Sequence, residues 1–469
     1  MNRNQDSNNP NNRGGSSSPR LPVGKDARRS AYLRARRRQR RLQLLLAVCV
    51  VVALGTLAVL GVMVVRRKTP PAPPSTSDSG AVSSTSSAVS ENPGTTPTLP
   101  AVTTDPPATT TPAVTDPPVS DARTLSLIAC GDNIVHSDII RDAQRRSNTA
   151  NPNYNFYDMY AGVARLIGGA DISFINMEGN VAGPSFGYNG YPNFNAPNEI
   201  AEAFVKLGFD VVNVANNHML DNGEAGLKGT VEYFRTLNFM TIGGYKKTDF
   251  DDLRIFEKNG IRVAFLSYCE MINFGKDVPA SSDYLIPFIK EEDMTRQIKK
   301  AKSAADFVVV SLHFGEEDSF EPSAAQKRAA QLCADLGADV VIGHHSHTVQ
   351  PAGWLTGKNG NRTFVTYSLG NFISTQYYAK NMAGAMLSLT FRIDADGTKS
   401  VENPKLIPTV THYVQDPASE HREGLQLYRV SEYTEALAAA HGTNVHNAFS
   451  LSILRAFYTS VIPEEFLEW

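Results

Sequence analysis

From residue 124 onward, short apolar runs alternate with amphipathic stretches along the chain. Several of the runs end on a polar or charged side chain. In order they are TLSLIACGD, ADISFINMEGN, GFDVVNVANNH, IRVAFLSY, ADFVVVSLHFG, GADVVIGHHSH and RTFVTYSLGNF. Runs of about five to eight residues between helical patterns are typical of strands in an α/β sheet with both faces covered. The pattern therefore predicts an α/β domain.

The segments between and after these runs predict the remaining elements. Helical spacing of apolar residues is found at 137–146, 224–237, 291–304 and 323–336. The later stretch AMLSLTFRIDADG alternates with a period of two, which predicts an antiparallel strand followed by a turn. The tail from about residue 423 is expected to be helical, with EYTEALAAAH and AFSLSILRAFY as its main segments.

A longer apolar run precedes the domain. Residues 44–65 are 22 residues without a charge, about 33 Å as a helix, which is enough to cross a hydrocarbon core. Six arginines lie between residues 34 and 41, and only Arg66, Arg67 and Lys68 follow the run. This bias predicts a single transmembrane helix, with a disordered basic segment at 1–43 in the cytoplasm and the rest outside.

Two other interpretations of the run are weaker. A cleaved signal peptide has an apolar region of about 7–15 residues and a small-residue cleavage site, and this run is longer. Lipid attachment at Cys49 would require a small preceding residue, where this chain has Val48. An uncleaved membrane anchor remains the prediction.

Residues 66–122 are rich in Pro, Ser and Thr and poor in large apolar side chains. Such a segment cannot bury enough surface to offset its ordering entropy, and its prolines favour an extended spacer. We expect a disordered extracellular linker at 66–122 and one folded domain at 123–469.

The charge distribution excludes one class of function. The net charge of −2 hides +13 in residues 1–68, −4 in residues 69–120 and −11 in the remainder. A folded domain this acidic is not a nucleic-acid binder with a broad basic surface. The four cysteines contain no CxxC pair, which excludes a zinc ribbon. Cys130, Cys269 and Cys333 are expected to be buried thiols, with a Cys130–Cys269 bridge as the alternative.

Polar side chains collect where the predicted strands end. They are Asp132, Glu178, Asn217, His218, His313, His344, His345 and His347. The carboxyl ends of strands in an α/β sheet meet at one crevice, so these side chains should converge. Imidazole, carboxylate and amide groups together are the ligands of divalent transition metals. A lone histidine is usually a buried core residue, but three within four residues favour a metal site.

The ordered set GD, NMEGN, NNHxxD, LHFGEE, GHHSHTVQP and YSLGNF resembles the CapA family, named for capsule (poly-γ-glutamate) synthesis. The resemblance covers roughly residues 124–375. That family is similar to the calcineurin-like metallophosphoesterases. The resemblance therefore implies a four-layered α/β/β/α sandwich with a site for two divalent metal ions, among which Mn, Zn and Fe are not distinguished.

The resemblance also implies roles for individual residues. The implied metal ligands are Asp132, Glu178, Asn217, His313, His345 and His347. His218 is implied as the catalytic histidine, and Asp221 as the carboxylate that orients it. A helix N-cap is the alternative role for Asp221. His344, outside the matched pair, is expected to point away.

The chain departs from the enzyme pattern at two positions. Ile134 stands where the first motif of the enzymes has a histidine, and Glu178 stands where an aspartate bridges the metals. One metal would then have Glu178, Asn217, His313 and His345 as ligands, and the other only Asp132, Glu178 and His347. His136 or water are the candidates for the gap. Glu316 and Glu317 either face the crevice or cap a loop, and Asn371 is expected to shape the loop.

Three functions are compatible with these features. The first is a membrane-anchored component of poly-γ-glutamate-type polymer synthesis, export or attachment, working with membrane subunits of the synthesis machinery. The second is a surface metallophosphoesterase unrelated to capsule. The third is a metal-binding module without turnover. The expected location is the cell membrane, with the large domain outside.

The predicted topology has a direct test. Protease added to intact cells should cut within 69–120 and release a soluble fragment, because that segment is expected to be outside and unfolded. Immunoblotting of the medium measures the release. Full protection in intact cells, with cleavage after lysis, would contradict the orientation.

Overall fold

A computed structural model of the chain describes residues 121–415, 418 and 420–469. The predicted basic segment at 1–43, the membrane helix at 44–65 and all but the last two residues of the linker at 66–122 lie outside this part. Among the helices that the structure describes, none combines the length and the apolar character that a membrane crossing requires.

The first of two large sheets is mixed. In the described residues it has eight strands in the order β16-β15-β14-β1-β2-β3-β4, with β13 beside β1. Their bounds are β1 (Arg123–Ile134), β2 (Ile172–Glu178), β3 (Val211–Asn213), β4 (Met240–Ile242), β13 (Asn371–Ile373), β14 (Ala383–Ile393), β15 (Lys399–Gln415) and β16 (Arg422–Arg429). Strands β1 to β4 are parallel, whereas β14, β15 and β16 are antiparallel to their neighbours.

The second sheet has the order β11-β12-β10-β9-β7-β6. Its strands are β6 (Arg254–Lys258), β7 (Ile261–Cys269), β9 (Phe307–His313), β10 (Val340–His344), β11 (Ala352–Thr356) and β12 (Arg362–Thr366). The four central strands are parallel, and β6 and β11 run antiparallel at the two edges. A separate ribbon pairs β5 (Tyr245–Lys246) with β8 (Tyr284–Leu285).

Helices follow most of the parallel strands. They are α2 (Ser137–Arg145), α3 (Ala164–Gly169), α4 (Glu199–Leu207), α5 (Gly223–Thr236), α6 (Glu291–Ala304), α7 (Ala324–Asp335), α8 (Glu435–Ala440) and α9 (Leu451–Val461). The helices predicted at 137–146, 224–237, 291–304 and 323–336 are confirmed within one residue at each end. Helix α7 begins at a capping box in which Ser323 and Gln326 bond each other's backbone amides.

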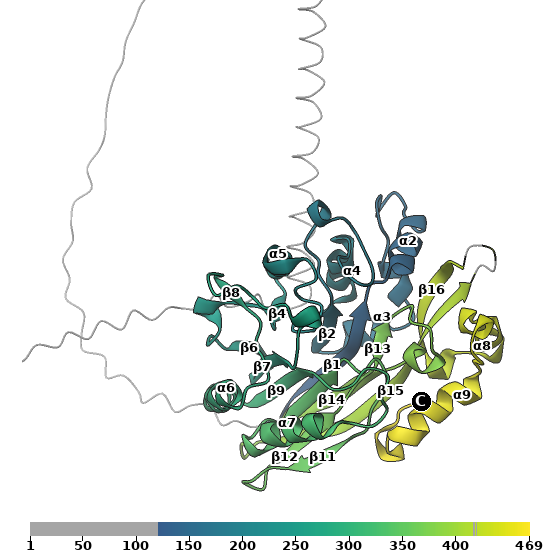
Figure 1. The fold of residues 1–469 in the computed structure, drawn as a ribbon. Helices are drawn as coiled ribbons and strands as arrows, with labels where there is room; N and C mark the ends of the chain where they lie inside the picture. The colour runs from purple at the N-terminus through teal and green to yellow at the C-terminus, as the bar shows by residue number, and fades with distance from the viewer. Residues whose placement is uncertain (1–120, 416–417, 419) are drawn as a thin grey trace, which may run out of the picture. The chain divides into compact units, whose positions relative to one another are not determined.

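Alternation along the strands of the second sheet separates two cores. On β9, Phe307 and Val309 face the first sheet, whereas Val308 and Val310 pack with residues of α6 and α7. The contact between the sheets includes Phe307 against Phe391 of β14, with ring centroids 4.7 Å apart. Helices α6 and α7 therefore cover the outer face of the second sheet (Figure 1).

The first sheet has a similar division. Phe174 of β2 points between the sheets, whereas its neighbour Ser173 points outward and donates a hydrogen bond of 2.6 Å to the Ile167 carbonyl of α3. Helices thus lie outside both sheets, so the layers follow the order α/β/β/α. The predicted mixed α/β fold is confirmed.

The C-terminal part differs from the prediction. Residues 422–429 form strand β16, so a helical tail starting near residue 423 is wrong, although α8 and α9 do form later. The 17-residue strand β15 was not expected, and it contains Pro404 and Pro408, which weaken any strand pattern in the sequence. The predicted antiparallel strand in AMLSLTFRIDADG is present as β14.

Three cysteines lie within the described residues, and all are buried and unbridged. They are Cys130, Cys269 and Cys333. The alternative of a Cys130–Cys269 disulfide is not present.

The contact between the sheets predicts a stability effect. Phe174 is fully buried and stacks on Phe265 and on His344, with centroid distances of 6.4 and 5.8 Å. Phe174→Ala should lower the free energy of unfolding by about 3–5 kcal/mol, because it leaves a cavity between the sheets. Urea unfolding with a chelator present measures this effect apart from metal binding. Phe274→Ala is the control, because that ring is 69% exposed and its loss should change little; equal effects would contradict this packing.

Candidate metal centre

The ends of four parallel strands bring the predicted ligands together between the two sheets. Asp132 lies opposite Asn176 in the β1–β2 pairing, and Ile134 lies opposite Glu178. His313 is the last residue of β9, and His344 is the last residue of the neighbouring β10. The shared strand direction explains why residues 213 positions apart, such as Asp132 and His345, are in contact.

Two buried carboxylates form the centre of the cluster. Asp132 and Glu178 are both fully buried. His347 lies between them, with Nδ1 3.4 Å from Asp132 Oδ2 and Nε2 3.7 Å from Glu178 Oε1. Neither oxygen of Glu178 has a hydrogen-bond partner among the described residues. A buried carboxylate in this state is unfavourable unless a positive charge is close to it.

Asn217 and the remaining histidines complete the cluster. The Nε2 atom of His313 lies 2.9 Å from the amide oxygen of Asn217, and its Nδ1 atom is buried without a partner. The ring of His345 is 4.8 Å from that of His313 and 6.0 Å from that of His347, centroid to centroid. All six predicted ligands are therefore within one connected group.

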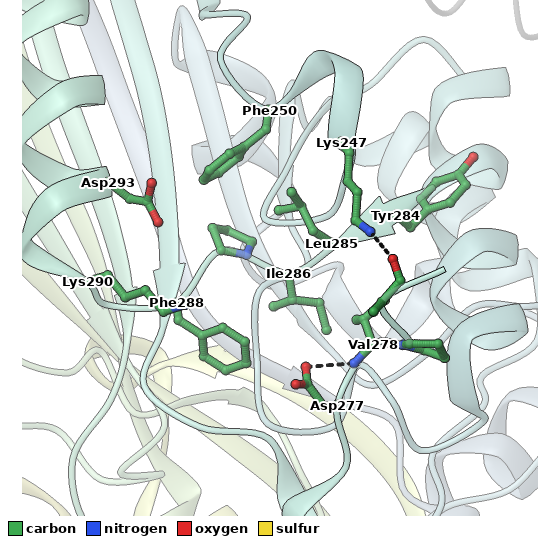
Figure 2. Close-up of a pocket in the computed structure, with 13 residues that line it drawn as sticks. Lys247, Phe250, Asp277, Val278, Tyr284, Leu285, Ile286, Phe288, Lys290 and Asp293 are labelled. Carbon is green, nitrogen blue, oxygen red and sulfur yellow. Dashed lines mark hydrogen bonds between the residues drawn. The ribbon is translucent and has the colours of Figure 1, made fainter. Parts of the chain in front are cut away.

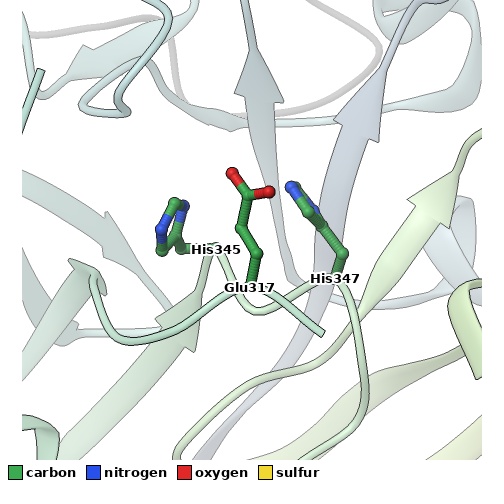
Figure 3. Close-up of side chains that lie close together, drawn as sticks. All are labelled: Glu317, His345 and His347. Carbon is green, nitrogen blue, oxygen red and sulfur yellow. The ribbon is translucent and has the colours of Figure 1, made fainter. Parts of the chain in front are cut away.

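Within this group, potential ligand atoms form two sets. Atoms of Asp132, Glu178 and His313 lie within 4.8 Å of one another, and so do atoms of Glu317, His345 and His347. Figure 3 shows the carboxylate of Glu317 between the two imidazoles of the second set. This differs from the division implied by the resemblance, in which His345 shared a metal with His313 and Glu317 had no assigned role.

The electrostatics of the cluster suit a divalent cation. Burial lowers the pKa of His313, and burial together with His347 lowers the pKa of His345 to about 3, so both imidazoles are neutral and able to bind a metal. Burial also raises the pKa of Glu178 well above its ordinary value. A cation beside Glu178 would supply the missing partner and favour its charged form. The donor set and the unpartnered oxygens therefore fit a divalent metal.

Asp132 and His347 hold opposite charges. Burial opposes ionisation of Asp132, but hydrogen bonds and charge from His344 and His347 keep its pKa well below the ordinary value. Burial likewise opposes charge on His347, and the carboxylates of Glu178 and Asp132 raise its pKa to about 10. Without a metal, protonated His347 is thus the main countercharge of the Asp132 carboxylate.

A chain of buried hydrogen bonds orients Asp132. Ser267 of β7 donates to the Asn213 side-chain oxygen at 2.5 Å, Asn213 donates to Asn176 at 2.8 Å, and Asn176 donates to Asp132 Oδ1 at 2.8 Å. The chain crosses from the second sheet to the first. Asp132 Oδ1 is therefore held in one orientation by a donor that is itself fixed.

The loop after β10 has a strained backbone. His345 and His347 have φ angles of +93° and +57°, in the region that favours glycine. Residues held in such conformations cost of order 1–3 kcal/mol each and are concentrated at functional sites. The amide of His345 donates to Asp132 Oδ2 at 3.0 Å, which ties this loop to β1.

His218 and Asp221 form a pair at the edge of the cluster. His218 Nδ1 lies 2.8 Å from Asp221 Oδ2, and the same oxygen accepts the Phe194 amide at 2.8 Å. Helix α5 has Asn222 as its N-cap, so Asp221 does not fill the alternative capping role. The catalytic roles assigned to His218 and Asp221 remain predictions.

The gap in the first motif lies inside the cluster. Ile134 is opposite Glu178 in the strand pairing and is 2% exposed, so an apolar side chain is placed beside the carboxylate. His136 does not enter either set of ligand atoms. Its Nδ1 atom is 3.4 Å from the Thr375 amide, and its ring packs against Phe194.

The position predicted for His344 is wrong. Its Nδ1 atom lies 3.2 Å from Asp132 Oδ1, and the residue is fully buried. It follows Val340 and Ile342 on one face of β10, so strand alternation in the sequence predicts that it points between the sheets. Asn371 contacts the loop near the site, as expected, with its side-chain oxygen 3.1 Å from His347 Nδ1.

One residue that contacts the cluster could not be identified from the sequence. Asn273 lies in a loop far along the chain, yet its side chain is 3.2 Å from the Asn217 amide nitrogen and 3.3 Å from His218 Nε2. No strand end or motif marks this position.

A separate pocket of about 220 Å³ lies beside the β5–β8 ribbon (Figure 2). None of its lining residues belongs to the cluster. Two of its charged groups form hydrogen bonds with the nearby backbone. Lys247 donates to the Ala280 carbonyl at 2.8 Å, and Asp277 accepts the Val278 amide at 2.7 Å. The cluster is therefore the better candidate for the functional site.

Comparisons with known proteins agree on one family. Residues 126–376 match the family model described as bacterial capsule synthesis protein PGA_cap. The chain is 33% identical over 209 residues to the capsule biosynthesis protein CapA of Bacillus anthracis, an alignment that covers 43% of this chain and 48% of that protein. It is 31% identical over 206 residues to the PGA biosynthesis protein CapA of Bacillus subtilis (strain 168), covering 44% and 52%. The chain thus spans about half the length of these curated relatives.

Solved structures give a much weaker similarity. The NAD nucleotidase NadN of Haemophilus influenzae aligns with a TM-score of 0.40 and 14% identity, over 72% of this chain and 60% of that chain. We infer nothing about activity from it.

The geometry of the cluster predicts an order of effects on metal content. His313→Ala or His345→Ala should lower bound manganese and reduce thermal stability in its presence, because binding to the native state stabilises it. His345→Ala and His347→Ala should each leave about one metal per chain, because both side chains belong to the set that contains Glu317. His218→Ala should leave the content unchanged. Elemental analysis of the purified protein measures this. Equal content in the wild type and the His313/His345 double variant would contradict a metal site.

Proposed function

Because this chain belongs to the bacterial capsule synthesis protein family PGA_cap, we propose that it acts in the synthesis, export or attachment of a poly-γ-glutamate-type polymer. The observation that carries the proposal is where the family match falls. The matched residues 126–376 contain the whole buried cluster, from Asp132 to His347. The family relation and the cluster therefore concern the same part of the chain.

The proposal includes a location at the membrane. The uncharged run at 44–65 and the arginines before it support a single anchor with the domain outside. A linker at 66–122 would hold the domain away from the surface, where a polymer leaves the cell. Membrane subunits that make the polymer are the proposed partners.

The proposed chemistry uses the six ligands in the cluster. They are Asp132, Glu178, Asn217, His313, His345 and His347. A divalent cation held by them would polarise a phosphoryl or carbonyl oxygen and lower the pKa of a bound water. His218 is positioned by Asp221 through Nδ1, so Nε2, which lies 3.3 Å from the Asn273 side chain, is the nitrogen that would move a proton.

The rim of the cluster supports binding of an anionic chain. Large apolar side chains are exposed on three loops that contact the cluster: Tyr191, Met271, Phe274, Tyr377 and Tyr378. Cations lie over several of these rings. Lys276 is 5.6 Å from the centre of Phe274, and Lys380 is 5.4 Å from that of Tyr378.

These cations offer local positive charge on an acidic domain. Lys276 is held by the Leu220 and Asp221 carbonyls, each at 3.2 Å, and Lys380 by the Asp318 carbonyl at 2.8 Å. Both lysines are thus positioned beside the cluster. A polymer carrying carboxylates would be attracted there, although the domain as a whole carries −11.

Two specific observations favour other functions. The His218–Asp221 pair favours a surface phosphoesterase, because it supplies a proton donor beside the ligands. Ile134 beside Glu178 favours a binding module without turnover, since it removes a ligand from the enzyme pattern. These are the second and third candidates.

Polymer binding tests the first candidate. Poly-γ-glutamate should bind the full-length chain in detergent. A Lys276→Gln/Lys380→Gln variant should bind about three- to tenfold more weakly, as expected for the loss of the exposed Lys276 charge and of the half-buried Lys380 charge, which also pairs with Asp318. Lys358→Gln is the matched control, because that lysine is 76% exposed and pairs with Asp335 away from the cluster. Fluorescence anisotropy with a labelled polymer measures the affinity, and salt should weaken it.

The outcomes separate the candidates. No polymer binding, together with manganese-dependent cleavage of a phosphodiester that is lost in His218→Ala, would favour the phosphoesterase. Bound metal with neither activity would favour the binding module. Either result would overturn the first candidate.

A further inference from the structure

Glu317 lies beside two histidines of the ligand cluster, His345 and His347. The resemblance leaves one metal position with only Asp132, Glu178 and His347, because Ile134 replaces the expected histidine. Glu317 is outside the resemblance's ligand set. Its carboxylate nevertheless lies within 4.8 Å of ring nitrogens of both His345 and His347 (Figure 3).

The loop that carries Glu317 is fixed on both sides. Gly315 has a φ of +101° and packs against Gln326, so a side chain there would collide with α7. The Gly315 amide donates to Glu270 at 2.8 Å, and the Asp318 amide donates to the Ser346 carbonyl at 2.8 Å. The last bond joins this loop directly to the loop of His345 and His347.

Contacts on the far side restrain the same loop. Asn381 donates to Asp318 Oδ1 at 2.8 Å and to the His347 carbonyl at 3.3 Å. Lys380 binds the Asp318 carbonyl at 2.8 Å. Glu317 thus has an exposed side chain on a backbone that is held against the cluster.

Apart from His347, whose pKa the Glu317 carboxylate helps to raise, no cationic side chain of the described residues pairs with this carboxylate. Within the part of the chain that the structure describes, no lysine or arginine forms an ion pair with Glu317, and it has no hydrogen bond. On the other side of the group, His345 is 4% exposed and its Nδ1 atom has no hydrogen-bond partner. An unpaired carboxylate and an unpartnered buried imidazole facing one point are the features of a cation site.

We propose that Glu317 is a metal ligand that, with His345 and His347, holds a second divalent cation. The inference rests on the metal centre of the proposed function. It changes that centre from one full and one deficient position to two positions with different ligands. The inner position has Asp132, Glu178 and His313, all buried, whereas the outer position has an exposed carboxylate.

Because the ligands of the two positions differ in burial, we expect the two cations to bind with different affinities. A ligand that is exposed to water loses solvation on binding and competes with water, so the outer cation should bind more weakly and exchange faster than the inner one. Two classes of binding should be separable by titration. Removing Glu317 should affect only the weaker class.

Manganese binding by the full-length chain in detergent tests this. Isothermal titration with MnCl₂ after chelation should give two classes of site in the wild type. Glu317→Gln should lose the weaker class or weaken it at least tenfold, and elemental analysis after gel filtration should fall from about two metals per chain to one. Glu316→Gln is the matched control, because it removes the adjacent exposed carboxylate, which belongs to neither set of ligand atoms.

Folding is checked in the same samples. Thermal unfolding in chelator should be unchanged by Glu317→Gln, because the side chain is exposed and has no protein partner. The proposal would be overturned if Glu317→Gln kept both classes of manganese site at unchanged affinity. It would also be overturned if the wild type had a single class of site that neither variant altered. If the wild type bound no manganese at all, the metal centre of the proposed function would be overturned, and this result is distinguishable from the two above.

Discussion

The structure depends on one unusual feature, a glutamate carboxylate buried between two sheets with neither oxygen hydrogen-bonded. An ionised carboxylate in such a place requires a neighbouring positive charge, since the interior offers little solvation. Protonated His347 meets this need in part, at 3.7 Å from Glu178. The imidazoles of His313 and His345 are neutral, and each has an Nδ1 atom without a partner. A divalent cation would therefore satisfy several unmet groups at once.

The fold produces this arrangement by aligning strand ends across two sheets. Asp132 and Glu178 come from the first sheet, and His313, His345 and His347 follow strands of the second. The hydrogen-bond chain from Ser267 through Asn213 and Asn176 to Asp132 joins the sheets below the cluster. The positive φ angles at His345 and His347 show that the connecting loop is held against its backbone preference. Phe174 stacks on His344, the residue that precedes this loop, with ring centroids 5.8 Å apart.

Part of this was predictable from the sequence and part was not. Apolar runs and helical spacing predicted the α/β core and four helices, because burial in a sheet or on one helix face sets the local spacing of apolar residues. Strand β15 was missed, because its two prolines are unusual in a strand, and β16 was predicted to be helical. That Asp132, Glu178, Asn217, His313, His345 and His347 lie close together could be predicted from strand ends and motifs. Glu317, Asn273 and the orientation of His344 depend on loop contacts and on register between distant segments, and local spacing does not encode these.

The central claim is that the Glu178 carboxylate is partnered by a divalent cation. Crystals of the chain soaked in MnCl₂, measured at the manganese absorption edge, test this most directly. The account predicts an anomalous peak in contact with Glu178 and with atoms of Asp132 and His313. Absence of such a peak, with both Glu178 oxygens hydrogen-bonded to ordered water or protein donors, would contradict it.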